Sequence, residues 1–444
     1  MLNNELALTF ESFENEDHFN CAFQAIDSQW IEDALFATEK ASIRRRRLPA
    51  QQAVWLIIMM GLMRNMSIKQ VCTTLDLALQ SKQENDFLPV APSVLTDCRK
   101  RLGESPLAYL FKTSNTAWLD SALSQPHKIG LHVLSTDGTT FRSQDTPENR
   151  AAFSFISKKQ HRVYPQLRMV GLMSTHSRMM LGAAFDSCNV GETTLAKRLL
   201  SDVPNNSLTL FDRCYFSADL LLSWGNNGMN THWLMPVKRR QRYEVITRYS
   251  DNDLLIEMPI SPQARAKNPL LPTTWQARMI CYQKPKGEIK GFITSLIDPE
   301  QYPMTELLSI YWQRWEIEEG FGEIKSNQLQ GEVTLRSRFP EGVRQELWGV
   351  LLGYNLVRLE MVAIADEAEV LPTRISFTAA ISIIDSQVRS YALSADGTLP
   401  KRLVQMRQYV KPFILPDKRK HRTFARSVLY IPSRYPLRYK PKEA

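Results

Sequence analysis

The periodicity of apolar residues changes at Pro126, and this change limits the possible fold more than any other feature of the chain. Between about residues 25 and 125, apolar side chains recur every three or four positions, which is the pattern of amphipathic helices. After Pro126, short runs such as KIGLHVLSTDG, QLRMVGLMST and SLTLFD are typical of strands, and helical segments lie between them. We therefore predict an all-helical domain followed by a mixed α/β sheet.

Charge is distributed unevenly, within a formal net charge of +9. Residues 1–40 carry nine acidic side chains and one basic one, whereas residues 411–444 carry ten basic and two acidic ones. The basic tail can lie along a phosphate backbone or remain a solvated terminus. The basic residues at 44–47 and 99–101 suit a helical DNA-binding module, and solvated helix faces would have the same composition.

The sequence lacks the features of a secreted, membrane-spanning or zinc-binding protein. Its start is acidic and has no basic region followed by an apolar run, so no secretory signal is expected. The most apolar stretch, Ala53–Met63, has eleven residues where crossing a bilayer needs about 20, so we predict a buried helix and no membrane partner. The six cysteines show no C-x-x-C spacing. A cytoplasmic protein is expected.

Two aspartates directly follow apolar runs that we interpret as strands. Asp137 comes after LHVLST, and Asp212 comes after SLTLF. Ligands and metals collect at strand ends in an α/β sheet, because the neighbouring loops open a crevice there. Each aspartate also has a structural interpretation, since Asp137 with Gly138 is a hairpin-turn signal and Asp212 can cap a helix.

A third carboxylate comes from the helical segment YWQRWEIEEGFGEIKSNQLQG. At about 100° per residue, four residues share an arc of about 60°: Tyr311, Arg314, Glu318 and Lys325. The other glutamates fall on another side of the helix: Glu316, Glu319 and Glu323. Glu318 is thus the glutamate that shares a face with a tyrosine, an arginine and a lysine, although a surface salt-bridge ladder would show the same pattern.

Together, Asp137, Asp212 and Glu318 would supply hard oxygen ligands of the kind that Mg²⁺ prefers. Two such ions about 3.5–4 Å apart activate a water or a 3′-hydroxyl and stabilise the leaving oxygen of a phosphodiester. Arg314 and Lys325 would hold phosphates beside this site, and the tyrosine of the same helix face could donate its hydroxyl to another phosphate oxygen. The pattern favours metal-dependent phosphodiester chemistry.

At these residues the sequence resembles the DDE transposases of bacterial insertion sequences, specifically the IS-four family. The family signature Y-x2-R-x3-E-x6-K is complete in four residues: Tyr311, Arg314, Glu318 and Lys325. TDGTTFR and the following DTPENRAAF look like the region of the first catalytic aspartate. FDRCYFS looks like the second-aspartate motif D-R-G-Y-F, with Cys214 in place of the glycine. LPAQQAVWLIIMMGLMRNMSIKQV is similar to the N-terminal helical domain of the family.

The resemblance implies a ribonuclease-H-like mixed-sheet catalytic core with a β-rich insertion, an all-helical domain before it and a helical, basic C-terminal region after it. We expect a helical N-terminal DNA-binding domain at 1–125, the first part of the core at 126–231, and the insertion at 232–300. Core helices carrying the catalytic glutamate would follow at 301–360, and a C-terminal helical region with the basic tail, for dimerisation or DNA contact, at 361–444. Strand-like runs between 232 and 300 independently favour the insertion.

The resemblance also implies cut-and-paste transposition of an insertion sequence. Such a protein binds terminal inverted repeats, cleaves the element ends through a hairpin, and transfers the 3′-hydroxyl ends into target DNA. The implied catalytic and metal-binding residues are Asp137, Asp212 and Glu318, with two Mg²⁺ ions or Mn²⁺ in their place. The implied DNA-binding residues are Tyr311, Arg314 and Lys325. A homodimer on double-stranded DNA is expected, in the bacterial cytoplasm and on the nucleoid when bound.

Three questions remain open at the level of sequence. Relatives hold a flipped base with a tryptophan of the insertion, for which Trp233 and Trp275 are candidates, with core packing as the alternative. The chain could also be a catalytically degenerate DNA-binding repressor, against which the intact carboxylates speak. It could finally be a two-metal nuclease that cleaves DNA without strand transfer.

Overall fold

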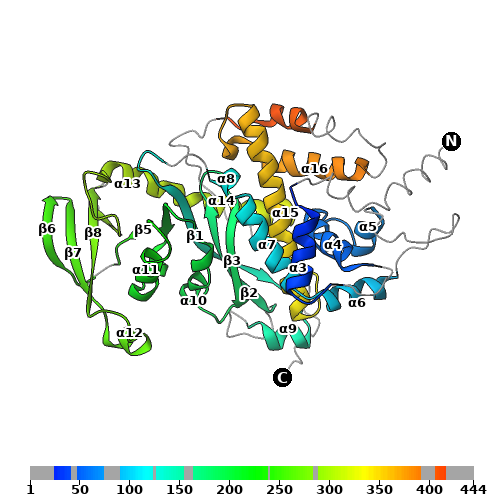
Figure 1. Ribbon diagram of the computed structural model, residues 1–444, viewed down its shortest axis with the longest axis horizontal. Coiled ribbons are helices and arrows are strands. Elements are labelled where there is room, and N and C mark those ends of the chain that lie inside the picture. Colours follow the sequence, from blue (N-terminus) through cyan, green and yellow to red (C-terminus); the bar gives the residue numbers. More distant parts are fainter. Residues whose placement is uncertain are drawn as a thin grey trace, which may run out of the picture.

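The computed structural model describes residues 25–41, 48–74, 91–123, 127–154, 164–238, 241–283, 289–391 and 406–416. Most of the predicted basic tail, from 417 onward, and the basic residues at 44–47 lie outside these described residues. Figure 1 shows helices gathered at one end of the molecule, a sheet through its middle, and the strands β6, β7 and β8 at the other end.

The N-terminal part of the chain is helical, as its periodicity predicts. Its helices are α3 (Ser28–Ala37), α4 (Ala50–Leu62), α5 (Ile68–Thr74), α6 (Pro92–Leu102), α7 (Ser105–Ala117) and α8 (Leu119–Ala122). Asp27 caps α3, because its side chain accepts a hydrogen bond from the backbone N–H of Gln29 at 2.9 Å. The apolar stretch predicted to be a buried helix is α4, and eleven of its thirteen residues are buried.

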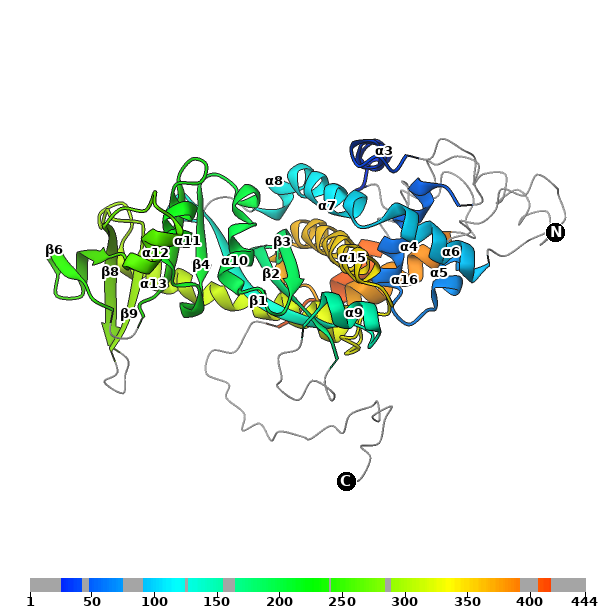
Figure 2. The same cartoon turned by 90° about the horizontal axis from the view of Figure 1, so that it is seen from below.

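Helix α15 (Pro340–Glu367) forms the centre of this helical region. By length and hydropathy it could cross a membrane, but 78% of its apolar window is buried inside the protein, as in a core helix. It lies against α4 and α7 (Figure 2). The backbones of α4 and α15 approach so closely that a Cβ on Gly61 would lie 2.6 Å from the carbonyl oxygen of Gly349. Glycine is therefore required at this crossing.

The rest of the chain forms a mixed α/β region around one nine-stranded sheet with the order β3-β2-β1-β4-β5-β9-β8-β7-β6. The first five strands are β1 (His132–Arg142), β2 (Gln166–Ser174), β3 (Met180–Ser187), β4 (Ser207–Phe211) and β5 (Thr231–Pro236). Strands β4 and β5 run parallel to β1, whereas β2 is antiparallel to both β1 and β3. The predicted mixed sheet is confirmed.

The β-rich block predicted at 232–300 continues this sheet. Its strands are β6 (Glu244–Ser250), β7 (Asp253–Pro259), β8 (Thr274–Gln283) and β9 (Ile289–Thr294), and all neighbouring pairs are antiparallel. Strand β5 pairs with β4 on one side and β9 on the other. The expected boundary at 232 therefore falls inside a strand that belongs to both parts, and the domain division itself stays a prediction.

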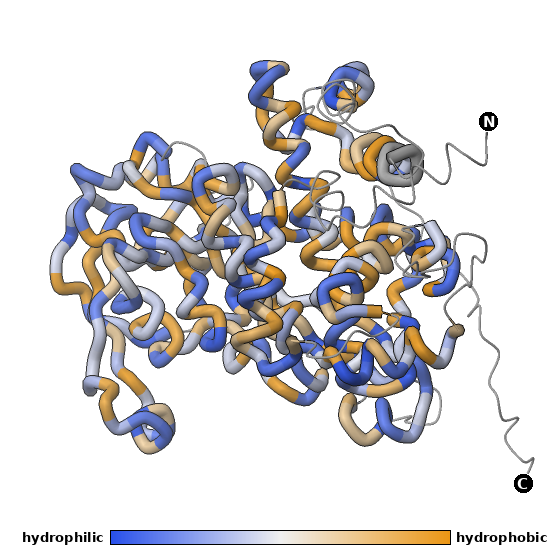
Figure 3. Tube along the Cα trace, turned by 45° about the vertical axis from the view of Figure 1, so that its right-hand side comes forward, coloured by the Kyte–Doolittle hydropathy of each residue, from blue (hydrophilic) through white to orange (hydrophobic). Residues whose placement is uncertain are grey.

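Helices cover the sheet and complete the chain. Three short ones follow strands of the core: α9 (Pro147–Ala152), α10 (Glu192–Lys197) and α11 (Ala218–Gly225). Helix α12 (Pro262–Lys267) joins β7 to β8, and α16 (Phe377–Tyr391) follows α15. Helix α13 (Met304–Tyr311) packs on the sheet through a separate apolar cluster that includes Leu208, Leu234 and Ile310. Figure 3 shows the resulting mixture of apolar and polar stretches along the trace.

The segment after α13 is helical but irregular, unlike the single α-helix predicted from its periodicity. A 3₁₀ turn occupies Trp312–Trp315, α14 spans Glu316–Gly322, and a π-helical turn spans Glu323–Gln328. The 3₁₀ turn winds more tightly than an α-helix and the π turn more loosely. Tyr311, Arg314 and Glu318 all precede the π turn, and their contacts show that they still face the sheet together. π turns are frequent at functional sites.

Candidate active site

The two aspartates lie side by side on neighbouring parallel strands. The last pair of the β1–β4 ladder is Thr136 with Phe211, and Asp137 and Asp212 are the next residue on each strand. Asp212 ends its strand, as predicted. The prediction for Asp137 is wrong, because β1 continues to Arg142 and Asp137 pairs with Gly171 of β2. The pairing of β1 with β4 stops directly before Asp137. Both carboxylates therefore still lie at the same end of the β1–β4 ladder.

The glycine after Asp137 lies against the side chain of a further acidic residue. A Cβ on Gly138 would lie 2.6 Å from the carboxylate carbon of Glu192, the first residue of α10. The Asp-Gly pair makes no hairpin, because both residues lie inside β1 and pair with β2. Glu192 is a fourth carboxylate beside the site. Glu192 also lies 3.7 Å from the Arg168 guanidinium. The sequence pattern did not identify Glu192. The one sequence signal for this residue is an acidic side chain at the start of a helix that follows a strand.

Arg314 joins the sheet to the helical segment that carries Glu318. Its Nη1 lies 3.4 Å from Oδ2 of Asp137, and its Nη2 donates to Oε1 of Glu318 at 2.7 Å. The three side chains are only partly exposed, at 15% for Arg314, 22% for Asp137 and 33% for Glu318. One guanidinium thus bridges two of the three candidate carboxylates.

The other two members of the signature contact the protein in different ways. The Tyr311 hydroxyl donates to the carbonyl oxygen of Phe211 at 3.2 Å, directly before Asp212. Burial raises the pKa of Tyr311, with a smaller opposite effect of Arg314. Lys325 lies farther along β1, with its Nζ 5.4 Å from the centre of the Phe141 ring. The structure therefore brings Tyr311, but not Lys325, next to the aspartates.

The electrostatics of the site centre on Asp137. Burial raises its pKa from 3.8 to about 6, and the negative charges of Glu318 and Asp212 act in the same direction. The N–H of Gly138, which donates to Oδ1 at 2.7 Å, and the Arg314 guanidinium lower this pKa in part. Asp137 is therefore a partly buried carboxylate among like charges, as expected where a cationic ligand binds.

The donor chemistry of the site fits a divalent metal ion, because carboxylate oxygens are the ligands that Mg²⁺ prefers. In the described part of the chain, however, no group of three or more His, Cys, Asp or Glu side chains is gathered closely enough to hold one ion. Arg314 lies between Asp137 and Glu318. An ion ligated by both of these carboxylates would have to replace the guanidinium there.

The glutamates excluded by the helical arc lie elsewhere, as predicted. Glu319 is exposed. Glu316 and Glu323 point to the opposite side, where Arg178 donates to Glu316 Oε2 through Nε at 2.7 Å and to Glu323 Oε1 through Nη1 at 2.6 Å. Glu323 also pairs with the fully buried Arg358. These two glutamates belong to a paired, buried network rather than to the candidate site.

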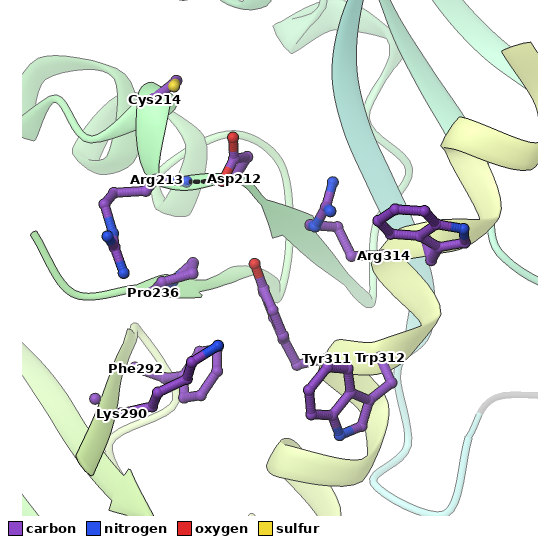
Figure 4. A pocket seen from close by; sticks show the side chains of 11 residues that line it. Asp212, Arg213, Cys214, Pro236, Lys290, Phe292, Tyr311, Trp312 and Arg314 are labelled. Carbon is purple, nitrogen blue, oxygen red and sulfur yellow. Dashed lines mark hydrogen bonds between the residues drawn. The ribbon is translucent and has the colours of Figure 1, made fainter. Parts of the chain in front are cut away.

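A pocket of about 490 Å³ opens beside Asp212 (Figure 4). Its lining includes cationic, aromatic and thiol side chains: Arg213, Cys214, Lys290, Tyr311, Trp312, Arg314 and Trp315. Trp312 is 63% exposed and Trp315 is 54% exposed, and the Arg314 guanidinium lies 5.9 Å from the centre of the Trp315 ring. Cys214, which stands where the resembled motif has glycine, is exposed at this pocket. Sequence reasoning gave no role to these two tryptophans.

The two tryptophans that the sequence offered for a flipped base are both buried. Trp233 is 2% exposed and Trp275 is 5% exposed, and their ring centres lie 5.7 Å apart. The Phe216 ring also packs against Trp275, with ring centres 6.3 Å apart. Both side chains therefore follow the core-packing alternative, and the exposed indoles near the carboxylates are Trp312 and Trp315 instead.

Comparisons with known proteins give two family matches, one on each side of the change in periodicity near residue 126. A family model described as "Transposase DDE domain" matches residues 130–356, and one described as "Insertion element 4 transposase N-terminal" matches residues 16–112. The transposase InsG for insertion sequence element IS4 of Escherichia coli (strain K12) is 35% identical over 427 residues, which is 94% of each chain. A solved piggyBac transposase synaptic complex with hairpin DNA aligns with a TM-score of 0.43 and 11% identity, over 91% of this chain and 86% of that one.

Proposed function

The chain belongs to the IS4 family of DDE transposases, and we propose that it performs the cut-and-paste transposition of its own insertion sequence. In this proposal it binds the terminal inverted repeats, cleaves the DNA at the element ends through a hairpin, and joins the 3′-hydroxyl ends to target DNA. It does so as a homodimer that holds both ends, in the bacterial cytoplasm.

The catalytic residues in this proposal are Asp137, Asp212 and Glu318, on a ribonuclease-H-like core. Their support is the register of β1 and β4, which sets the two aspartates side by side, and the Arg314 bridge that brings Glu318 to them. DDE transposases generally use divalent metal ions, and these three carboxylates would hold two Mg²⁺, or Mn²⁺. Such ions activate the attacking oxygen of a phosphodiester reaction and stabilise the leaving one.

The remaining side chains of the site bind and orient DNA. The planar guanidinium of Arg314 suits a phosphate oxygen pair, and its release from the carboxylates would couple phosphate binding to cation binding. Lys325 would contact a phosphate farther along β1. Tyr311 holds the end of β4 through the carbonyl oxygen of Phe211, which fixes the backbone that carries Asp212.

The pocket beside Asp212 would receive a nucleotide next to the scissile phosphate. Its exposed indoles, Trp312 and Trp315, offer faces on which an unpaired base can stack, a contact worth about 1–3 kcal/mol per base. Lys290 and Arg213 supply positive charge at the same opening. Cations together with exposed aromatic rings are the usual composition of a single-strand contact.

The observation that carries the proposal is the position of Asp137 and Asp212 directly after the last β1–β4 pair, with Arg314 bridging Glu318 to Asp137. It is tested with purified protein, Mg²⁺ and linear DNA ending in the element's own inverted repeats. Nicked, hairpin and joined products are expected on denaturing gels, and none with EDTA. Replacing any of the three carboxylates by alanine should abolish all products and leave end binding intact.

The matched control is Glu319→Ala, an exposed position on the same helix, which should cut and join DNA like the wild type. Wild-type joining by a variant of Asp137, Asp212 or Glu318 would overturn the site assignment. Cleavage without joined products would instead favour a nuclease, and end binding without any cleavage would favour a repressor.

A further inference from the structure

We propose that Arg178 is a positioning residue that sets the place of Glu318 relative to Asp137. The inference rests on the proposed role of Glu318 and concerns a residue outside the signature. Arg178 lies in the turn between β2 and β3, and its guanidinium contacts two glutamates of the helical segment, Glu316 and Glu323. These stand two residues before and five residues after Glu318.

The turn presents Arg178 in a fixed conformation. Its backbone has a φ of 57°, a left-handed value that is uncommon for a residue with a side chain. Its N–H donates to the carbonyl oxygen of Ser174 at 3.0 Å, which closes the turn. The side chain is only 6% exposed. Burial and a closed turn leave the guanidinium little freedom to follow the helix if the helix moves.

The contacts tie the helix that carries Glu318 to the strand that pairs with Asp137. Strand β2 pairs with β1 at Gly171 and Asp137, and the turn after β2 carries Arg178. One planar guanidinium contacts two carboxylates spaced by about two helical turns. Sliding or rotating the segment would break at least one of these contacts. A lysine, with a single point charge, cannot hold both in the same way.

The second carboxylate oxygen of Glu323 is held by side chains of α15. This Oε2 accepts from the Tyr354 hydroxyl at 3.0 Å and pairs with Arg358, and both partners come from α15. Glu323 opens the π turn, so this turn brings its carboxylate to both arginines. The helix also lies close to β2, since Gly320 is next to the Met173 side chain.

The test is Arg178→Lys in the full-length protein, with two readouts. Half-saturating Mg²⁺ for end cleavage should rise about 10–100-fold, as for other changes in the groups that orient metal ligands. Mn²⁺ binding to the protein, followed by electron paramagnetic resonance, should weaken by a similar factor. DNA-end binding should stay unchanged. Arg198→Lys, at an exposed arginine paired with Asp186, is the matched control and should change neither readout.

A second variant separates positioning from stability. Val357→Ala removes buried apolar volume from α15 at a side chain that can form no hydrogen bond or ion pair of the network, and can be compared with Arg178→Lys at equal distance from their urea midpoints. Wild-type Mg²⁺ dependence and Mn²⁺ affinity in Arg178→Lys would overturn the proposal, as would the same loss in Val357→Ala. If the wild-type protein cleaves no DNA, the proposed function fails, and Mn²⁺ affinity still decides the role of Arg178.

Discussion

The helical segment from Tyr311 to Gln328 sets glutamates in two very different surroundings. On the site side, Glu318 shares one arginine, Arg314, with Asp137, and both carboxylates are partly exposed. On the opposite side, which we call the clamp side, Glu316 and Glu323 form ion pairs with Arg178, and Glu323 also pairs with Arg358. This network is largely buried. Charges balance on the clamp side, whereas carboxylates outnumber arginines on the site side. Such an excess of negative charge favours binding a cation, and a balanced network favours rigidity.

Glutamates on the two sides of the segment should respond differently when their negative charge is removed. Glu318→Gln should reduce end cleavage by at least about 10³-fold, because the carboxylate proposed as catalytic is lost while the fold keeps its contacts. Its urea midpoint should stay near that of the wild type. The measurement is single-turnover cleavage beside equilibrium unfolding, and a large loss of stability in this variant would contradict the distinction.

On the clamp side the expected effect is on the fold. Glu323→Ala leaves Arg178 and Arg358 buried without this partner, and breaking a buried ion pair by removing one side lowers the free energy of unfolding by about 3–5 kcal/mol. Urea denaturation measures this loss. Glu319→Ala, exposed on the same helix, should change the free energy by less than about 0.5 kcal/mol. An equally small effect of Glu323→Ala would show that the clamp contributes little.

Lys325 tests how far the site side extends along β1. Lys325→Ala should weaken binding to the element ends by up to about tenfold and reduce the slope of log affinity against log salt by about 1. Lys112→Ala, at an exposed lysine near Asp202, serves as the control. A salt titration of end binding is the measurement, and an unchanged slope would remove Lys325 from the phosphate contacts.

The smallest expected effect concerns the stability of the site side. Because the pKa of Asp137 is raised from 3.8 to about 6 in the folded protein, its ionisation opposes folding as the pH rises through this window. Asp137→Asn removes this penalty, so its melting temperature should exceed that of the wild type by about 1–3 °C at pH 7. At pH 4 the difference should vanish, and thermal melts at the two pH values measure it.

Local periodicity predicted much of the site. Asp212 ends a short apolar strand, which a run such as SLTLF indicates without any tertiary information. The helical arc also placed Arg314 and Glu318 on one face, although the segment contains a 3₁₀ turn and a π turn. The 3₁₀ turn before Glu318 is only four residues long and leaves both side chains on that face, where they contact each other. The π turn follows Glu318 and changes the winding at Lys325, which lies apart from the aspartates.

Residues that depend on pairing between distant segments could not be predicted. Asp137 lies inside β1 only because β2, about thirty residues later, supplies a partner for the second half of the strand. Glu192 reaches the site because α10 packs on β2, which sets the Glu192 carboxylate beside Gly138. Arg178 sits in the turn THSR, whose sequence carries no signal for a contact with a helix some 140 residues away.

The sheet is continuous from the core to its outer edge, since β5 is hydrogen-bonded to β4 on one side and to β9 on the other. Large hinge motions need loop residues that can change φ and ψ, and a ladder of backbone hydrogen bonds offers none. The outer strands and β4 are therefore parts of one hydrogen-bonded sheet, joined through β5. A displacement of the outer strands would be transmitted through β5 to β4, which ends directly before Asp212.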